Sequence, residues 1–172
     1  MIVLKGPMKT EELKKFIQNL SPDLYSFAYV LIPDDLQASQ LMIDCVQSFL
    51  IQKKSFIDRM TLSKSKSAQI FLDETKDQIF QIIFELSRKR YQQLKMSFSD
   101  VEQGGGFFSL EFDEKAILYL KERSNFKLTQ IEMITGNTQA EVLAYLFSAR
   151  VKMSELIPNQ IAYDEVQIGG VS

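Results

Sequence analysis

Residues 126–157 constrain the fold of this chain more than any other stretch. They predict a short helix, a tight turn at Gly136 and a longer helix that ends before Pro158. Thr138 is well placed to cap the start of the longer helix. This order is a helix-turn-helix pattern, a common means of placing a helix in the major groove of DNA. A helical domain is therefore expected near the C-terminal end of the sequence.

The charge around this motif does not suit a simple DNA-binding protein. The 172 residues have a formal net charge of −2. Residues 1–100 hold 14 basic and 12 acidic residues, whereas residues 101–172 hold 6 basic and 10 acidic residues. The motif thus lies in the acidic part of the sequence, although binding to phosphate requires basic side chains.

The composition excludes several kinds of chemistry. The chain has no His and a single Cys, Cys45, so His-based catalysis, His metal sites, an internal disulfide and a Cys-cluster zinc site are all ruled out. Cys45 lies in an apolar helical stretch and is expected to be a small core residue. With no nucleophile–base pair evident, we expect a protein that is not an enzyme and that binds no metal or cofactor.

The sequence shows no sign of a membrane segment. No apolar stretch reaches the ~18 residues that a spanning helix needs, and the opening residues MIVLKGPM are too short for a secretory signal. A cytoplasmic protein without a membrane partner is expected.

Apolar residues at helical spacing predict further helices along the whole chain. A helix is expected from Thr10, a new helix from Pro22, and long helices over residues 36–52 and about 68–94. Leu41, Cys45 and Phe49 form one apolar stripe of the 36–52 helix. No alternating pattern of useful length indicates a strand, so the predicted fold class is all-α.

A glycine-rich segment divides the predicted helices into two lobes. Residues 97–109 contain three consecutive glycines, which resist regular structure and predict a linker. The first lobe is expected over residues 1–96 and the second over residues 110–158, with a tail over residues 159–172. A helix over residues 112–121 opens the second lobe.

This layout resembles that of bacterial RNA polymerase sigma factors of the extracytoplasmic-function type. Residues 20–50 resemble the start of the first domain of that family, and residues 126–153 match the helix-turn-helix of its second domain without a gap. Ile131, Gly136 and Val142 fall on the isoleucine, the turn glycine and the valine of the family motif, and Ala149 and Arg150 fall on its Ala-Arg pair.

The resemblance implies a transcription initiation factor that binds the β′ clamp of core RNA polymerase and promoter DNA. The implied polymerase-binding residues are Gln40, Leu41 and Asp44. The implied DNA-binding residues are Arg88, Lys89, Arg90, Thr138, Gln139, Tyr145, Arg150 and Lys152.

The sequence departs from the family pattern at its functional positions. Gln40 and Ile43 replace the aspartate and glutamine of the polymerase-binding helix. In the longer helix of the motif, Glu141 replaces a threonine and is expected to repel phosphate. The polar or basic positions that follow hold Leu143, Tyr145 and Ser148.

Two functions remain open from the sequence. The first is a sigma factor that recruits RNA polymerase to promoters. The second is a sigma-like interaction module that has lost promoter recognition and binds a protein partner on the helix over residues 138–156. Leu143, Tyr145 and Leu146 cannot all point inward on one helix, which favours a protein-binding surface there. Residues 88–90 likewise allow two interpretations, a DNA contact or a basic helix C-terminus.

Overall fold

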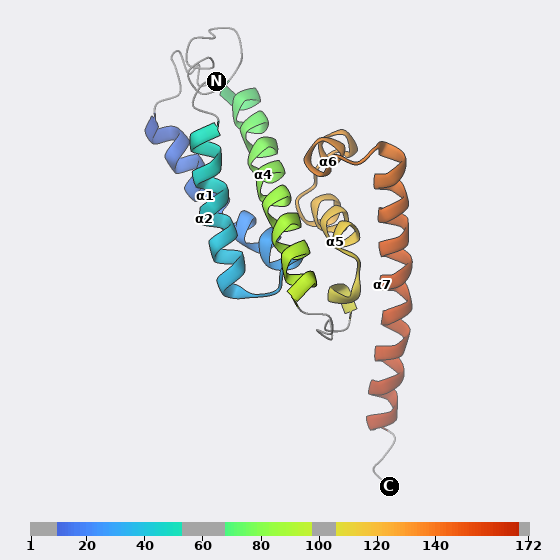
Figure 1. The fold of residues 1–172 in the computed structure, drawn as a ribbon. Helices are drawn as coiled ribbons and strands as arrows, with labels where there is room; N and C mark the ends of the chain where they lie inside the picture. Colours follow the sequence, from blue (N-terminus) through green and yellow to red (C-terminus); the bar gives the residue numbers. More distant parts are fainter. Residues whose placement is uncertain (1–9, 53–67, 98–105, 169–172) are drawn as a thin grey trace. The chain divides into compact units, whose positions relative to one another are not determined.

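The computed structural model describes residues 10–52, 68–97 and 106–168. Regular structure in these ranges is helical throughout and includes no strand (Figure 1). The all-α fold class predicted from the sequence is therefore confirmed. Two compact units, Met1–Ser97 and Phe98–Ser172, make up the chain, and each is described by itself.

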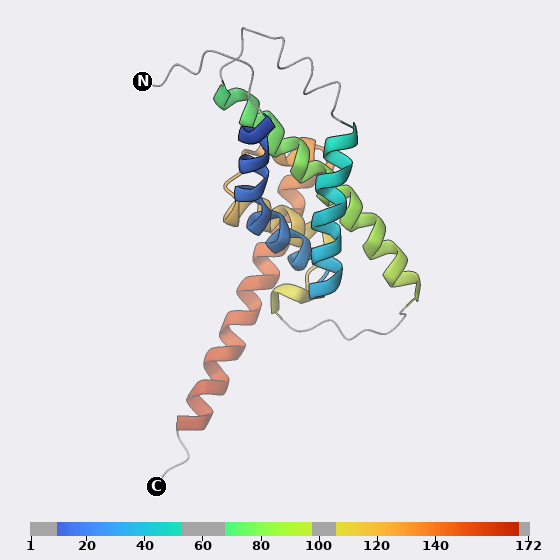
Figure 2. The same ribbon diagram turned by 90° about the vertical axis from the view of Figure 1, so that its left-hand side faces the viewer.

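The first unit is built from the helices α1 (Thr10–Leu31), α2 (Asp35–Gln52) and α4 (Ala68–Ser97), each of which packs on the other two (Figure 2). Helical spacing turns one apolar stripe of each helix inward. The rings of Phe27 and Phe80 lie 5.5 Å apart in the resulting core. The other large, fully buried side chains of this core are Leu24, Leu31, Phe49, Ile79, Ile83 and Phe84.

Helix α1 continues through Pro22, so the new helix expected there is wrong. Proline removes one backbone donor and costs about 3 kcal/mol inside a helix. The burial of side chains before and after Pro22 favours a continuous helix in spite of this cost. Leu20 and Leu24 lie before and after Pro22 and are both buried. In Figure 2 the ribbon of α1 changes direction part-way along its length, as expected for a proline kink.

Helix α2 agrees closely with the prediction. Asp34 caps it, because its carboxylate accepts a hydrogen bond of 2.8 Å from the backbone N–H of Gln37. The predicted stripe is buried together with one further residue, so that the inward side chains are Ala38, Leu41, Cys45 and Phe49.

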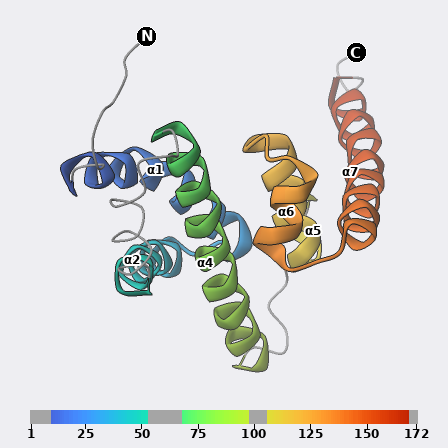
Figure 3. The same ribbon diagram turned by 90° about the horizontal axis from the view of Figure 1, so that it is seen from above.

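The second unit contains a 3-10 turn (Gly106–Ser109), α5 (Phe112–Leu118), a π-helical turn (Tyr119–Arg123), α6 (Leu128–Thr135) and α7 (Gln139–Ile168). Figure 3 shows α5 and α6 on the same side of α7. The core of this unit includes Leu110, Ile117, Leu120, Phe126, Ile131, Ile134, Val142, Leu146 and Ala149. Of the predicted linker, residues 98–105 lie outside the described part of the chain, and residues 106–109 form the 3-10 turn.

Helix α7 extends further than the sequence predicted. It runs through Pro158 to Ile168, so the expected helix end is wrong and most of the expected tail is helical. A proline inside a helix removes one backbone N–H and its ring crowds the carbonyl four residues earlier, a cost of about 3 kcal/mol that does not end the helix here. α7 is consequently the long helix that stands along α5 and α6 in Figures 1 and 3.

Candidate functional site

The turn between α6 and α7 has the geometry that the sequence predicted. Gly136 ends α6 in the left-handed conformation, with φ of 72°, and its N–H donates to the carbonyl of Glu132 at 2.8 Å. The Asn137 amide approaches Asp113 of α5 at 3.5 Å. The turn is therefore closed by its own backbone and lies against α5.

A capping box fixes the first turn of α7. Thr138 donates from its backbone N–H and from its hydroxyl to the Glu141 carboxylate, at 2.7 and 2.8 Å. The Glu141 N–H approaches the Thr138 hydroxyl oxygen at 3.4 Å, which completes the box. The backbone and side-chain hydrogen bonds from Thr138 lower the pKa of Glu141. Glu141 thus stabilises the helix start, a role that the T-x-x-E spacing of Thr138 and Glu141 indicates.

The basic side chains of α7 are engaged within the second unit. The Lys152 ammonium donates to both carboxylate oxygens of Glu114, at 2.8 and 2.9 Å. The Arg150 guanidinium pairs with the carboxylate of Glu122, in the π-helical turn after α5. Both residues were predicted to bind DNA, yet each is already paired with an acidic side chain.

Glu114 links α5 to α7 and is not among the site residues predicted from the sequence. Its side chain is only 4 % exposed, and it accepts hydrogen bonds from the Ser148 hydroxyl at 2.6 Å and from the Glu111 backbone N–H at 2.9 Å. Burial alone would raise the pKa of this carboxyl, but the hydrogen bonds from Lys152, Ser148 and Glu111 outweigh it and lower the pKa. No local sequence pattern predicts the pair of Glu114 and Lys152, because 38 residues separate them.

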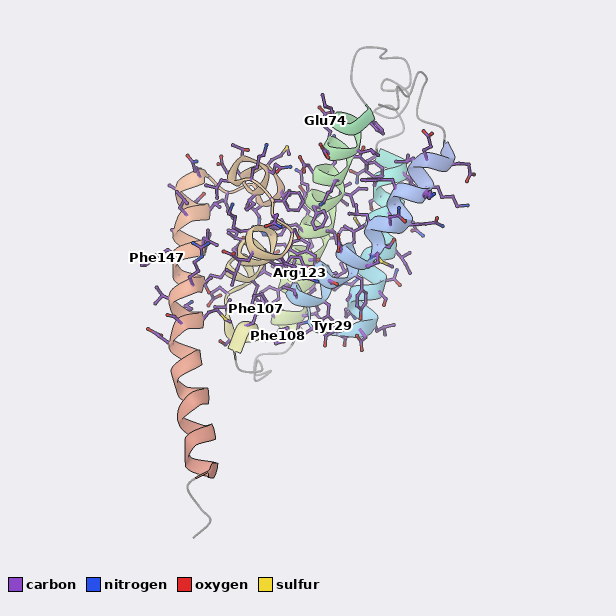
Figure 4. All side chains as sticks on the ribbon, turned by 180° about the vertical axis from the view of Figure 1, so that it is seen from behind. Tyr29, Glu74, Phe107, Phe108, Arg123 and Phe147 are labelled. Carbon is purple, nitrogen blue, oxygen red and sulfur yellow. The ribbon has the colours of Figure 1, made fainter. Side chains whose placement is uncertain are left out.

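One exposed face of α7 is apolar. Phe147 is 71 % exposed, Leu143 47 % and Val151 39 %. Figure 4 shows Phe147 pointing away from α5 and α6. Ala140 and Ala144 are also exposed and lie on the same face at helical spacing. We call the set Ala140, Leu143, Ala144, Phe147 and Val151 the apolar face of α7.

The expectation that this helix cannot bury all of its apolar side chains is confirmed. Leu146 is buried, Tyr145 is half-buried and Leu143 is exposed. Thr138 and Gln139 are exposed at the helix start, where Thr138 serves as the cap. Of the positions that would read DNA, Leu143 is exposed and apolar and Tyr145 is half-buried, while Glu141 is exposed and acidic.

The basic run of residues 88–90 lies within α4 and does not end it. The Arg88 guanidinium stacks over the Phe84 ring, 4.5 Å from its centroid, while Lys89 is exposed and Arg90 half-buried. Since α4 continues to Ser97, the interpretation of this run as a basic helix C-terminus is wrong.

The residues with an implied polymerase-binding role lie on α2. Gln40 is exposed and donates to the Asp44 carboxylate at 2.8 Å, and Asp44 is half-buried. Leu41 is only 2 % exposed. Its side chain belongs to the core, which removes it from any contact surface on α2.

The described ranges contain neither a candidate metal site nor a candidate membrane-spanning helix. No group of His, Cys, Asp or Glu side chains there could hold a metal ion. Nor is any helix in those ranges both long enough and apolar enough to cross a bilayer.

Comparison with known proteins supports the fold. No protein-family model matches the sequence, and no curated protein matches it. Among solved structures, the chain is similar to the sigma factor RpoE from Bartonella quintana, which was co-crystallised with the anti-sigma factor NepR. The TM-score is 0.61 at 18 % sequence identity, and the match covers 87 % of this chain and 98 % of that chain. The protein has a sigma-like fold.

Proposed function

We propose that this protein regulates transcription initiation as a sigma-like interaction module, in which α7 contacts a protein surface in place of promoter DNA. The observation that carries this proposal is the surface of α7. Its basic side chains Arg150 and Lys152 pair with Glu122 and Glu114, while its outward side is apolar. Core RNA polymerase is the first partner to test, in keeping with the sigma-like fold.

Electrostatics argues against DNA as the ligand of this helix. DNA affinity at physiological salt comes largely from basic side chains that displace counterions from phosphate. Arg150 and Lys152 bring two positive charges to α7, and Glu122 and Glu114 place two negative charges beside them. Phosphate would have to compete with these carboxylates for the same side chains, so little net attraction remains.

The apolar face of α7 has the character of a protein contact. Aromatic and aliphatic side chains at the centre of an interface supply most of the binding free energy once they are removed from water. Phe147 lies in the middle of this face, between Leu143 and Val151, and is its most exposed large side chain. The solved sigma factor with the similar fold was co-crystallised with another protein, an anti-sigma factor. This supports a protein as the partner of the present chain.

The test combines DNA binding with capture of core RNA polymerase. Fluorescence anisotropy with a labelled mixed-sequence duplex at about 50 and 200 mM salt should show no salt-dependent binding. Leu143→Glu with Phe147→Glu should weaken capture of core polymerase about tenfold, because charge is placed in a dry contact. Met133→Glu, at an exposed apolar position of α6, is the matched control and should leave capture unchanged. Salt-dependent binding of the duplex by the unmodified protein would overturn the proposal.

A promoter-binding sigma factor is the second candidate, and one observation favours it. Arg88, Lys89 and Arg90 place a basic run on α4, with Lys89 exposed and Arg88 held over the ring of Phe84. If the protein binds labelled single-stranded DNA and Lys89→Ala weakens that binding while reducing its salt dependence, promoter contact through the first unit is supported.

A further inference from the structure

The first unit carries an apolar groove that the proposed function does not use. It lies between α1 and α2 and has a volume of about 550 Å³. Its apolar lining is formed by Leu13, Ile17, Met42, Ile43, Val46 and Leu50. Ile43 and Leu50 are 45 % and 46 % exposed, so the groove presents aliphatic surface to water.

The dimensions of the groove suit a short stretch of helix. Along α1 it extends from Leu13 to Ser21, which corresponds to about 12 Å at a rise of 1.5 Å per residue. A groove of this kind accepts apolar side chains spaced one turn apart on an amphipathic helix. Lys14 is the single charged residue in its lining and lies near the Leu13 end.

The apolar face of α7 matches this groove in length and charge. Leu143, Phe147 and Val151 are spaced one turn apart and also extend over about 12 Å. Glu155 follows Val151 by one further turn and is exposed. When Val151 is laid at the Leu13 end of the groove, Glu155 comes near Lys14. Arg150 and Lys152 flank Val151 but are paired with Glu122 and Glu114, so Glu155 supplies the charge opposite to that of Lys14.

We propose that the chain self-associates, with the apolar face of α7 of one copy docked in the α1/α2 groove of a second copy. In a symmetric pair each copy contributes both its groove and its α7 face, which makes two identical contacts. One such contact buries little surface compared with the ~1,200–2,000 Å² of a stable interface. Two contacts in one assembly bury more surface and strengthen each other. A groove that instead takes an unrelated apolar ligand is the rival outcome of the test.

This inference rests on the proposed function in one respect, since it uses the same face of α7. Self-association would cover that face and so compete with the binding of core polymerase. The two ideas can still fail separately. A protein that stays monomeric, while Leu143→Glu with Phe147→Glu still impairs polymerase capture, would overturn the inference alone.

Complementation between two variants of the full chain is the decisive experiment. Sedimentation velocity across a wide concentration range should show the unmodified protein dimerising. Ile43→Glu places a carboxylate in the groove, and Phe147→Glu places one on the apolar face of α7. Each substitution alone should weaken dimerisation about tenfold or more. Mixed in equal amounts, the two variants should associate more strongly than either variant alone, because one of the two contacts, the intact α7 of Ile43→Glu in the intact groove of Phe147→Glu, is restored.

Controls separate this arrangement from simpler ones. Met133→Glu should dimerise like the unmodified protein, and circular dichroism should show unchanged helix content in all three variants. Pairing of α7 with α7, or of groove with groove, would leave the mixture no better than the single variants. A monomer at every concentration, dimers unaffected by either substitution, or a mixture without recovery would each overturn the proposal.

Discussion

Lys152 donates from its ammonium group to both carboxylate oxygens of Glu114, at 2.8 and 2.9 Å. Glu114 belongs to the first turn of α5 and is almost fully buried, and Ser148 of α7 donates to the same carboxylate. One acidic side chain therefore holds α7 against α5 and takes up a positive charge that a DNA-reading helix would present to phosphate.

Glu114→Gln should lower the free energy of unfolding by about 1–3 kcal/mol, because a buried hydrogen-bonded charge pair is broken. The loss is limited by the Lys152 side chain, which is 45 % exposed and can turn to water. Urea unfolding measures the change. Glu122→Gln is the matched control, because its pair with Arg150 is exposed and should contribute less than about 1 kcal/mol. Equal losses in the two variants would contradict the structural role of Glu114.

The stability that Glu114 confers should disappear in acid. Burial acts to raise the pKa of Glu114, but hydrogen bonds from Lys152, Ser148 and the Glu111 backbone lower it below its ordinary value. A carboxyl with a lowered pKa in the folded state stabilises the fold above its unfolded pKa, about 4.3, and loses this contribution as the pH falls through the folded pKa. The Tm difference between the unmodified protein and Glu114→Gln should be constant near neutral pH and shrink below about pH 4.3. A difference that persists in strong acid would argue against this assignment.

Thr138→Ala should destabilise the protein by about 1 kcal/mol, because it removes the hydroxyl of the α7 capping box. Amide hydrogen exchange should speed up at Glu141, whose N–H approaches that hydroxyl. Thr129→Ala offers a control at an exposed position of α6 and should be close to neutral. Similar losses at both positions would mean that the cap contributes nothing specific.

Leu143→Arg with Phe147→Arg should strengthen the binding of DNA by α7. Both side chains are exposed, so the new charges can reach phosphate. Two added phosphate contacts should steepen the slope of log K against log salt by about 1.8. Leu143→Gln with Phe147→Gln removes the same apolar surface without adding charge and should leave DNA binding unchanged. No gain from the Arg pair would show that another surface covers this face in solution.

Cys45 should be unreactive in the folded protein. Its thiol is buried against the carbonyl of Ile79 at 3.4 Å, and burial raises its pKa to about 12. A thiol-reactive disulfide reagent at neutral pH should therefore label Cys45 only when the first unit unfolds. Labelling should follow urea unfolding. Fast labelling without denaturant would contradict the burial of this residue.

The helices and their inward faces follow from local rules, which is why they could be predicted. Leu41, Cys45 and Phe49 lie one turn apart in the sequence, and helical geometry alone places them on one side of α2. The two helix ends assigned to proline were wrong for a related reason. Pro22 and Pro158 impose a local cost, whereas the helices that contain them continue beyond that cost.

The sequence by itself determined an all-α chain, the turn at Gly136 and the absence of His-based chemistry. It also determined that the helix after the turn has too many apolar side chains to bury. Only the tertiary structure decided what happens to the charges of that helix. Arg150 and Lys152 meet Glu122 and Glu114, which lie 28 and 38 residues away. Pairing at such separations depends on how helices pack, because charge interactions depend on distance in space and on exclusion of water, and local sequence specifies neither.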